Sequence, residues 1–151
     1  MLVTVAAFYV SLLLWVVFFA RDERRSINVI PFDMIHQQGF TLNVWGNILM
    51  FVPLGIYVLF MMKKRNMLVA IFYTLLCSVA IEVIQFVFAR GSSDIDDVLL
   101  NTFGGAVGVI IFRLISVIWR QRLKQQLVLA IMSTIVGVPM IFLTTILRLA
   151  N

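Results

Sequence analysis

The most informative stretch of this sequence runs from Met67 to Ala89 and reads MLVAIFYTLLCSVAIEVIQFVFA. It is long enough for a membrane-spanning helix, which needs ~20 apolar residues, and yet it contains Glu82. A charged side chain at the centre of such a helix costs at least ~2.5 kcal/mol, so acids at this depth mark functional positions. We therefore predict a transmembrane helix that carries a functional carboxyl group.

The remainder of the chain is similarly apolar. Of its 151 residues, 62% are hydrophobic and 13% charged, and the mean hydropathy is +1.06. A soluble core of this size cannot hide five long apolar runs, so we expect a single membrane domain over residues 1–151. The expected fold is all-α, a compact bundle of five transmembrane helices. The predicted spans are residues 2–20, 42–62, 67–89, 98–118 and 127–147.

The segment between the first and second spans mixes polar and apolar residues, including Asn28, Pro31 and Phe32. This mixture is typical of a re-entrant or interfacial segment, which we expect to cover the polar site described below. The first span is expected to be a retained anchor, because its apolar run exceeds the ~7 to 15 residues of a signal-peptide core.

The formal net charge of +5 comes from basic residues that cluster beside the ends of the predicted spans. Membrane topology and anionic headgroups explain such clusters better than nucleic acid, which we do not expect as a partner. The connections after the second and fourth spans carry more cations than the opposite side, which predicts a multi-pass cell-membrane protein with a cytoplasmic N-terminus and an outward C-terminus. The first group is Lys63, Lys64, Arg65, Arg120, Arg122 and Lys124, with Arg113 of the fourth span able to snorkel to that side; the second is Arg21, Arg24, Arg25, Arg90 and Arg148.

Polar residues in the apolar runs recur at helical spacing, every three or four residues. In the third run, one such line contains Thr74, Ser78, Glu82 and Gln85. In the fourth run, a second line contains Asp94, Asp97, Asn101, Gly105 and Gly108. Gly104 and Gly108 also have the Gly-x-x-x-Gly spacing that allows close helix packing, which we favour over a ligand role. Both helices are therefore expected to turn a polar or small-residue face toward the bundle.

Consecutive spans cross the membrane in opposite directions, so the starts of the second and fourth spans and the end of the third lie on the same side. The polar residues of these three spans are therefore expected on one side of the membrane. The residues lie roughly 6 to 12 Å inside their helix ends, or just above them. We predict a shared polar pocket at the membrane boundary. Its candidate ligand-binding residues are Asn47, Glu82, Gln85, Arg90, Asp94, Asp97 and Asn101.

Three segments resemble motifs of the VanZ-like family. They are NILMFVPLG from Asn47 to Gly55, EVIQ from Glu82 to Gln85, and RGSSDIDDVLLNTFG from Arg90 to Gly104, with a weaker match from Asn28 to Phe32. Each motif alone is weak, but three in order at fitting spacing give a specific signal over about residues 27–112. The resemblance implies a role in low-level resistance to teicoplanin, a lipid-bearing glycopeptide, or to other envelope-directed antimicrobials. It does not imply a molecular mechanism.

Three hypotheses about function remain open. The favoured one is an outward polar pocket that binds a lipid-linked envelope component or a lipoglycopeptide, in a protein surrounded by membrane lipids and with its oligomeric state open. The second is an intramembrane enzyme acting on a lipid or polyprenyl substrate, in which Glu82 serves as a base and Asp94 and Asp97 hold a divalent cation. The third is a small transporter. No catalytic or metal-binding motif is present, so we expect no cofactor or resident metal, and the sequence does not decide whether catalysis occurs.

Overall fold

The protein was studied as a computed structural model, which describes residues 7–11, 27–88 and 93–149. Long helices make up most of this part of the chain: α3 (Leu42–Met61), α4 (Met67–Val87), α5 (Ile95–Ile118) and α6 (Arg122–Leu149). The shorter elements are β1 (Ile27–Asn28), α2 (Asp33–Gln38) and β2 (Ser93–Asp94). Residues 7–11 are also helical.

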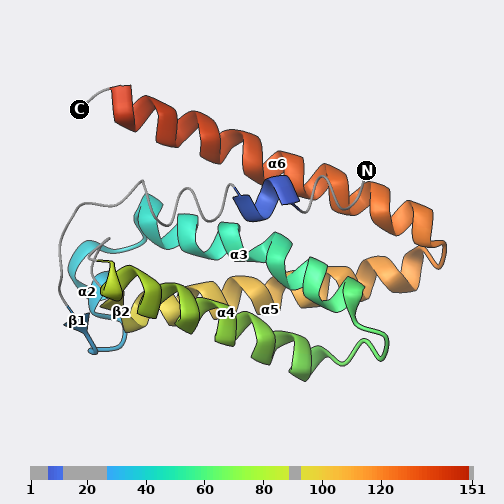
Figure 1. The fold of residues 1–151 in the computed structure, drawn as a ribbon, viewed down its shortest axis with the longest axis horizontal. Helices are drawn as coiled ribbons and strands as arrows, with labels where there is room; N and C mark the ends of the chain where they lie inside the picture. The colour runs from blue at the N-terminus through green and yellow to red at the C-terminus, as the bar shows by residue number, and fades with distance from the viewer. Residues whose placement is uncertain (1–6, 12–26, 89–92, 150–151) are drawn as a thin grey trace.

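Helices α3, α4 and α5 pack against one another, with the most extensive contact between α3 and α5, and α6 packs on α3. Figure 1 shows α6 on the side of α3 that faces away from α4 and α5. Strands β1 and β2 and helix α2 gather at one end of the bundle, and the α3–α4 and α5–α6 connections lie at the other (Figure 1). We call the first end the polar end and the second the basic end.

Three helices in the described residues are long and apolar enough to cross a membrane: α3, α4 and α5. They confirm the second, third and fourth predicted spans, although α5 begins at Ile95 rather than Val98 because Asp94 caps it. The fifth predicted run lies in helix α6, and the first lies largely outside the described residues. The number of five spans therefore stays a prediction, as does a re-entrant path for the segment that contains α2.

Glycines allow α3 and α5 to approach closely. A Cβ atom on Gly104 would overlap the carbonyl oxygen of Ile48, and one on Gly108 would overlap that of Val52. From the other side, a Cβ on Gly55 would overlap the carbonyl oxygen of Gly105. Backbone therefore lies directly against backbone, as the Gly-x-x-x-Gly spacing predicts. We call this contact the glycine seam.

Polar side chains tie α6 and residues 7–11 to α3. The Ser133 hydroxyl, on α6, donates to the Tyr57 hydroxyl of α3 at 3.0 Å. Tyr57 stacks on Tyr9, with ring centroids 6.0 Å apart, and the Tyr9 hydroxyl donates to the carbonyl oxygen of Met50. These contacts hold the outer layer on the face of α3 that the glycine seam leaves uncovered.

Candidate functional site

Helix α4 turns a mainly polar face toward the bundle. Its buried residues are Ala70, Thr74, Ser78, Ile81, Glu82 and Gln85, and these include the whole line of polar residues that the sequence spacing singles out. Glu82 is 4% exposed and Gln85 is 1% exposed, so neither side chain faces lipid. The carboxyl group inside the third span thus points into the protein, toward the start of α5.

Glu82 reaches the segment that precedes α5. Its Oε2 atom accepts a hydrogen bond from the backbone N–H of Asp94 at 3.2 Å. Asp94 is the N-cap residue of α5, and its Oδ1 atom accepts from the backbone N–H of Asp96 at 2.9 Å. A carboxylate at this position satisfies a helix N–H group that has no intrahelical partner and complements the positive end of the helix.

Two side-chain pairs join the three helices just below this cap. The Asn47 amide of α3 donates to Asp97 Oδ1 of α5. One turn further along α5, the Asn101 amide donates to the Ser78 hydroxyl of α4 at 3.0 Å. Asn101 is 5% exposed, and its Oδ1 atom has no hydrogen-bond partner among the described residues. A buried polar atom left in this way is costly, so this acceptor is an exception within an otherwise hydrogen-bonded cluster.

The segment from β1 to α2 is fastened onto the same cluster. Strand β1 pairs in parallel with β2, with Asn28 opposite Asp94, and Asn28 Nδ2 lies 3.3 Å from Asp94 Oδ2 and 3.2 Å from Asp33 Oδ2. Asp96 Oδ1 accepts a hydrogen bond from the backbone N–H of Phe32, whose φ of 63° lies in the left-handed region. The segment from β1 to α2 is therefore held at the start of α5 by the carboxyl groups of Asp94 and Asp96.

Burial raises the pKa of Asp94 above its ordinary value of 3.8. The hydrogen bond from the Asp96 N–H opposes this increase in pKa, and the negative charge of Asp97 adds to it. The network thus favours the neutral form of Asp94 relative to a solvent-exposed aspartate.

The structure brings most of the predicted site residues into one region. Five of them take part in the hydrogen bonds described above: Asn47, Glu82, Asp94, Asp97 and Asn101. Gln85 is buried one turn beyond Glu82 on the same face of α4, and Arg90 lies outside the described residues. We call the five connected residues, together with Ser78, Asn28, Asp33 and Asp96, the polar network. The role of each as a ligand-binding residue stays a prediction.

Sequence reasoning missed three members of this network. Asp33 and Asp96 are not among the candidate site residues, and Asn28 is predicted only as part of the interfacial segment and of a weak family match. The partners of Asn28 and Asp96 lie across the parallel β1–β2 contact, which has no periodic signal because each strand has only two residues. Within the described part of the chain, no group of three or more His, Cys, Asp or Glu side chains is arranged to hold a metal ion.

Apolar helices of spanning length, with a buried polar network at one end of their bundle, define the class of helical membrane proteins. A sequence model of the VanZ/LLP1 family matches residues 6–120, and the chain belongs to that family. It is 32% identical to Protein VanZ of Enterococcus faecium over 117 residues, which cover 72% of this chain and 71% of the relative. No solved structure matches the chain.

Proposed function

We propose that this VanZ-family protein lowers susceptibility to teicoplanin-type lipoglycopeptides or other envelope-directed antimicrobials. In this proposal the polar network is the binding site for polar groups of a lipid-linked envelope component or of the drug itself. Two observations support it. The chain belongs to the VanZ/LLP1 family, and the buried Oδ1 atom of Asn101 has no hydrogen-bond partner among the described residues.

The chemistry of the polar network suits a ligand rich in hydroxyl and amide groups. Asn101 Oδ1 is an acceptor with no donor among the described residues, and Glu82 and Asp97 supply carboxylate oxygens close by. Hydrogen bonds to charged groups are about twice as strong as those between neutral groups, so sugar hydroxyls and amides would be held well here. An acyl or polyprenyl chain attached to the ligand would extend along the apolar outer face of α4, where Val79 and Val83 are exposed.

The orientation proposed from the sequence places the polar network at the outer leaflet. Seven of the twelve basic residues lie in the α3–α4 and α5–α6 connections, in the first turn of α6 or near the end of α5. The excess of Lys and Arg in short cytoplasmic loops then sets the basic end inside and the polar end outside. Glycopeptides and exported envelope precursors are found on the outer side of the membrane, so a site with this orientation would be able to meet them.

Asn101→Leu tests the proposal most directly. The substitution keeps a side chain of similar size, removes the open acceptor, and leaves Ser78 able to bond to its own helix. Thr102→Val is the matched control, because the Thr102 hydroxyl donates only to the Val98 carbonyl of the same helix. Both variants would be expressed in a teicoplanin-susceptible Gram-positive host, with membrane levels measured by immunoblot.

The expected result is that the unaltered chain and Thr102→Val raise the inhibitory concentration of teicoplanin equally. Asn101→Leu should lose most of this increase, since one hydrogen bond to a ligand is worth about fivefold in affinity. Asp97→Asn, which keeps the shape of the side chain and removes its charge, should also reduce the increase. Full protection by both Asn101→Leu and Asp97→Asn at normal membrane levels would reject the polar network as the binding site.

A further inference from the structure

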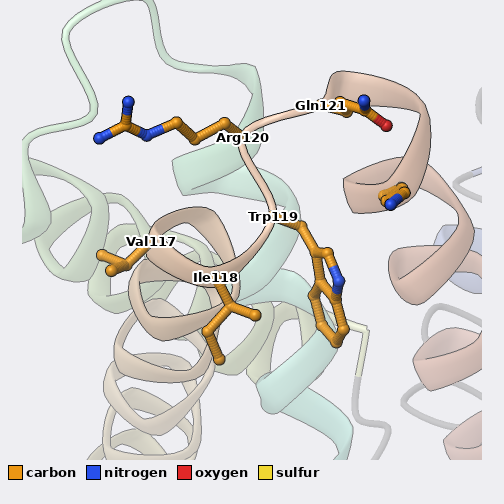
Figure 2. Close-up of a pocket in the computed structure, with 6 residues that line it drawn as sticks. Val117, Ile118, Trp119, Arg120 and Gln121 are labelled. Atoms are coloured by element: carbon orange, nitrogen blue, oxygen red, sulfur yellow. The ribbon is translucent and has the colours of Figure 1, made fainter.

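The basic end contains an open depression of about 320 Å³ where α5 passes into α6 (Figure 2). It is lined by Val117, Ile118, Trp119, Arg120, Gln121 and Lys124. Figure 2 shows the side chains of Trp119, Arg120 and Gln121 spreading in three directions from the connection. The lining of the depression therefore includes apolar side chains, an indole ring and two cationic side chains.

Among the described residues, no acidic side chain balances the charge of this end. All seven acids of the chain are at positions 22, 23, 33, 82, 94, 96 and 97, so none lies in or near the two connections. Helix α6 begins at Arg122 and has no acid in its first turn, which carries Lys124 instead. Cations at a helix N-terminus repel its positive end, and the free N–H groups there favour a bound anion. The local sequence thus produces a positive site that lacks its counter-charge.

Two other arginines of this end are already engaged, whereas Arg120 and Lys124 are available. The Arg65 guanidinium lies 5.3 Å from the ring centre of Phe112, and the Arg122 guanidinium lies 5.8 Å from that of Phe60. Both are within the distance of a cation–π contact. Arg120 and Lys124 are exposed and have no acidic partner among the described residues.

A buried glutamine fixes the shape of the depression. Gln125 is 2% exposed; its Nε2 atom donates to the Trp119 carbonyl oxygen at 2.6 Å, and its Oε1 atom accepts from Arg65 Nη2 at 3.1 Å. One side chain therefore joins both connections to α6. A site held in this way needs little ordering when it binds a ligand.

We propose that this depression binds the phosphate headgroup of an anionic phospholipid, with Arg120 and Lys124 contacting the phosphate and Trp119 marking the interface. The apolar wall favours a lipid over a free anion: Val117 and Ile118 are each 68% exposed at the end of a membrane-spanning helix, where they would contact the first carbons of an acyl chain. Basic pockets between transmembrane helices recognise lipid headgroups in this way. The proposal is independent of the function assigned to the polar network, which lies at the other end of the bundle.

The test uses the full chain in a neutral detergent, with bound lipid counted by native mass spectrometry. The probes are dioctanoyl phosphatidylglycerol, dioctanoyl phosphatidylcholine and inorganic phosphate. The variant is Arg120→Gln with Lys124→Gln, and its matched control is Lys63→Gln with Lys64→Gln, which removes the same charge from the neighbouring connection outside the depression. Circular dichroism would verify that both variants are folded.

Each basic contact to an anionic lipid is worth about fivefold in affinity, so the variant should bind phosphatidylglycerol roughly 25-fold more weakly. The control should lose less than about threefold, and phosphatidylcholine should bind weakly to every form. If the double variant fails to fold, Lys124→Gln alone should show the fivefold loss. Equal losses in variant and control would indicate diffuse attraction and overturn the proposal. Displacement of phosphatidylglycerol by an equal concentration of inorganic phosphate would overturn it too, by identifying a free-anion site.

Discussion

The two ends of the bundle differ in the sign of the charged side chains that lie at their helix N-termini. At the polar end, Asp94 and Asp96 are buried and accept hydrogen bonds from backbone N–H groups at the start of α2 or α5. At the basic end, Arg120 and Lys124 are exposed beside the start of α6, where a cation is unfavourable. The first arrangement stabilises the fold that contains it. The second does not, and so it indicates a counter-charge supplied from outside.

The largest expected effect concerns the glycine seam, on which the geometry of the polar end depends. Gly55→Ala places a Cβ against the backbone of Gly105, whereas Gly46→Ala, on the same helix, meets nothing within 4 Å. We expect Gly55→Ala to destabilise the protein by roughly 1–3 kcal/mol, because a rigid backbone cannot move aside. Gly46→Ala should be neutral or stabilising by up to ~1 kcal/mol. Thermal unfolding in detergent measures both, and similar values for the two would show that α3 and α5 are not in tight contact.

A smaller effect, a coupling energy of about 1 kcal/mol, is expected within the pair that joins α3 to α5 in the polar network. Asn47→Ala and Asp97→Ala should each cost about 1–3 kcal/mol, since each removes the hydrogen bond between a half-buried amide and a buried carboxyl group. The double variant should cost less than the sum of the two, by about 1 kcal/mol. Asn43→Ala is the control, one turn earlier on α3 and exposed, and should change stability by less than ~0.5 kcal/mol. Additive losses in the cycle would mean that Asn47 and Asp97 act separately.

The contrast between the ends also explains which features the sequence predicted. The three spans, the inward polar face of α4 and the glycine seam all follow from spacing within one helix, and the structure confirms them. The contact of Asp96 with Phe32 and the link from Gln125 to Arg65 join residues 64 and 60 positions apart. No local periodicity encodes such pairs, because they depend on how connections fold back over helix ends. Arg90, the orientation and the five-span topology stay predictions.

A third effect is a pH dependence of the free energy of unfolding that arises from Asp94 at the polar end. Burial raises the pKa of Asp94, so its contribution to stability is fully present below pH 3.8 and is lost as the pH rises through the folded-state value. Asp94→Asn keeps an effective N-cap and cannot titrate. The difference in unfolding free energy between the original chain and this variant should therefore fall as the pH rises from 3.8. Parallel stability curves in acid would show that the pKa of Asp94 is the same in the folded and unfolded states.

The smallest effect tests the unfavourable charge at the basic end. Lys124→Glu replaces a cation in the first turn of α6 with an anion, the arrangement that α5 already has with Asp96. The expected gain is about 0.3–1 kcal/mol in neutral detergent at low salt. It should nearly vanish in 1 M salt, where the Debye length is ~3 Å. Lys63→Glu, which makes the same charge change just past the end of α3, should show no gain, because a negative charge is unfavourable near a helix C-terminus. If Lys124→Glu instead lowers stability in detergent free of anionic lipid, the cation already has a partner within the protein and the two ends do not differ as described.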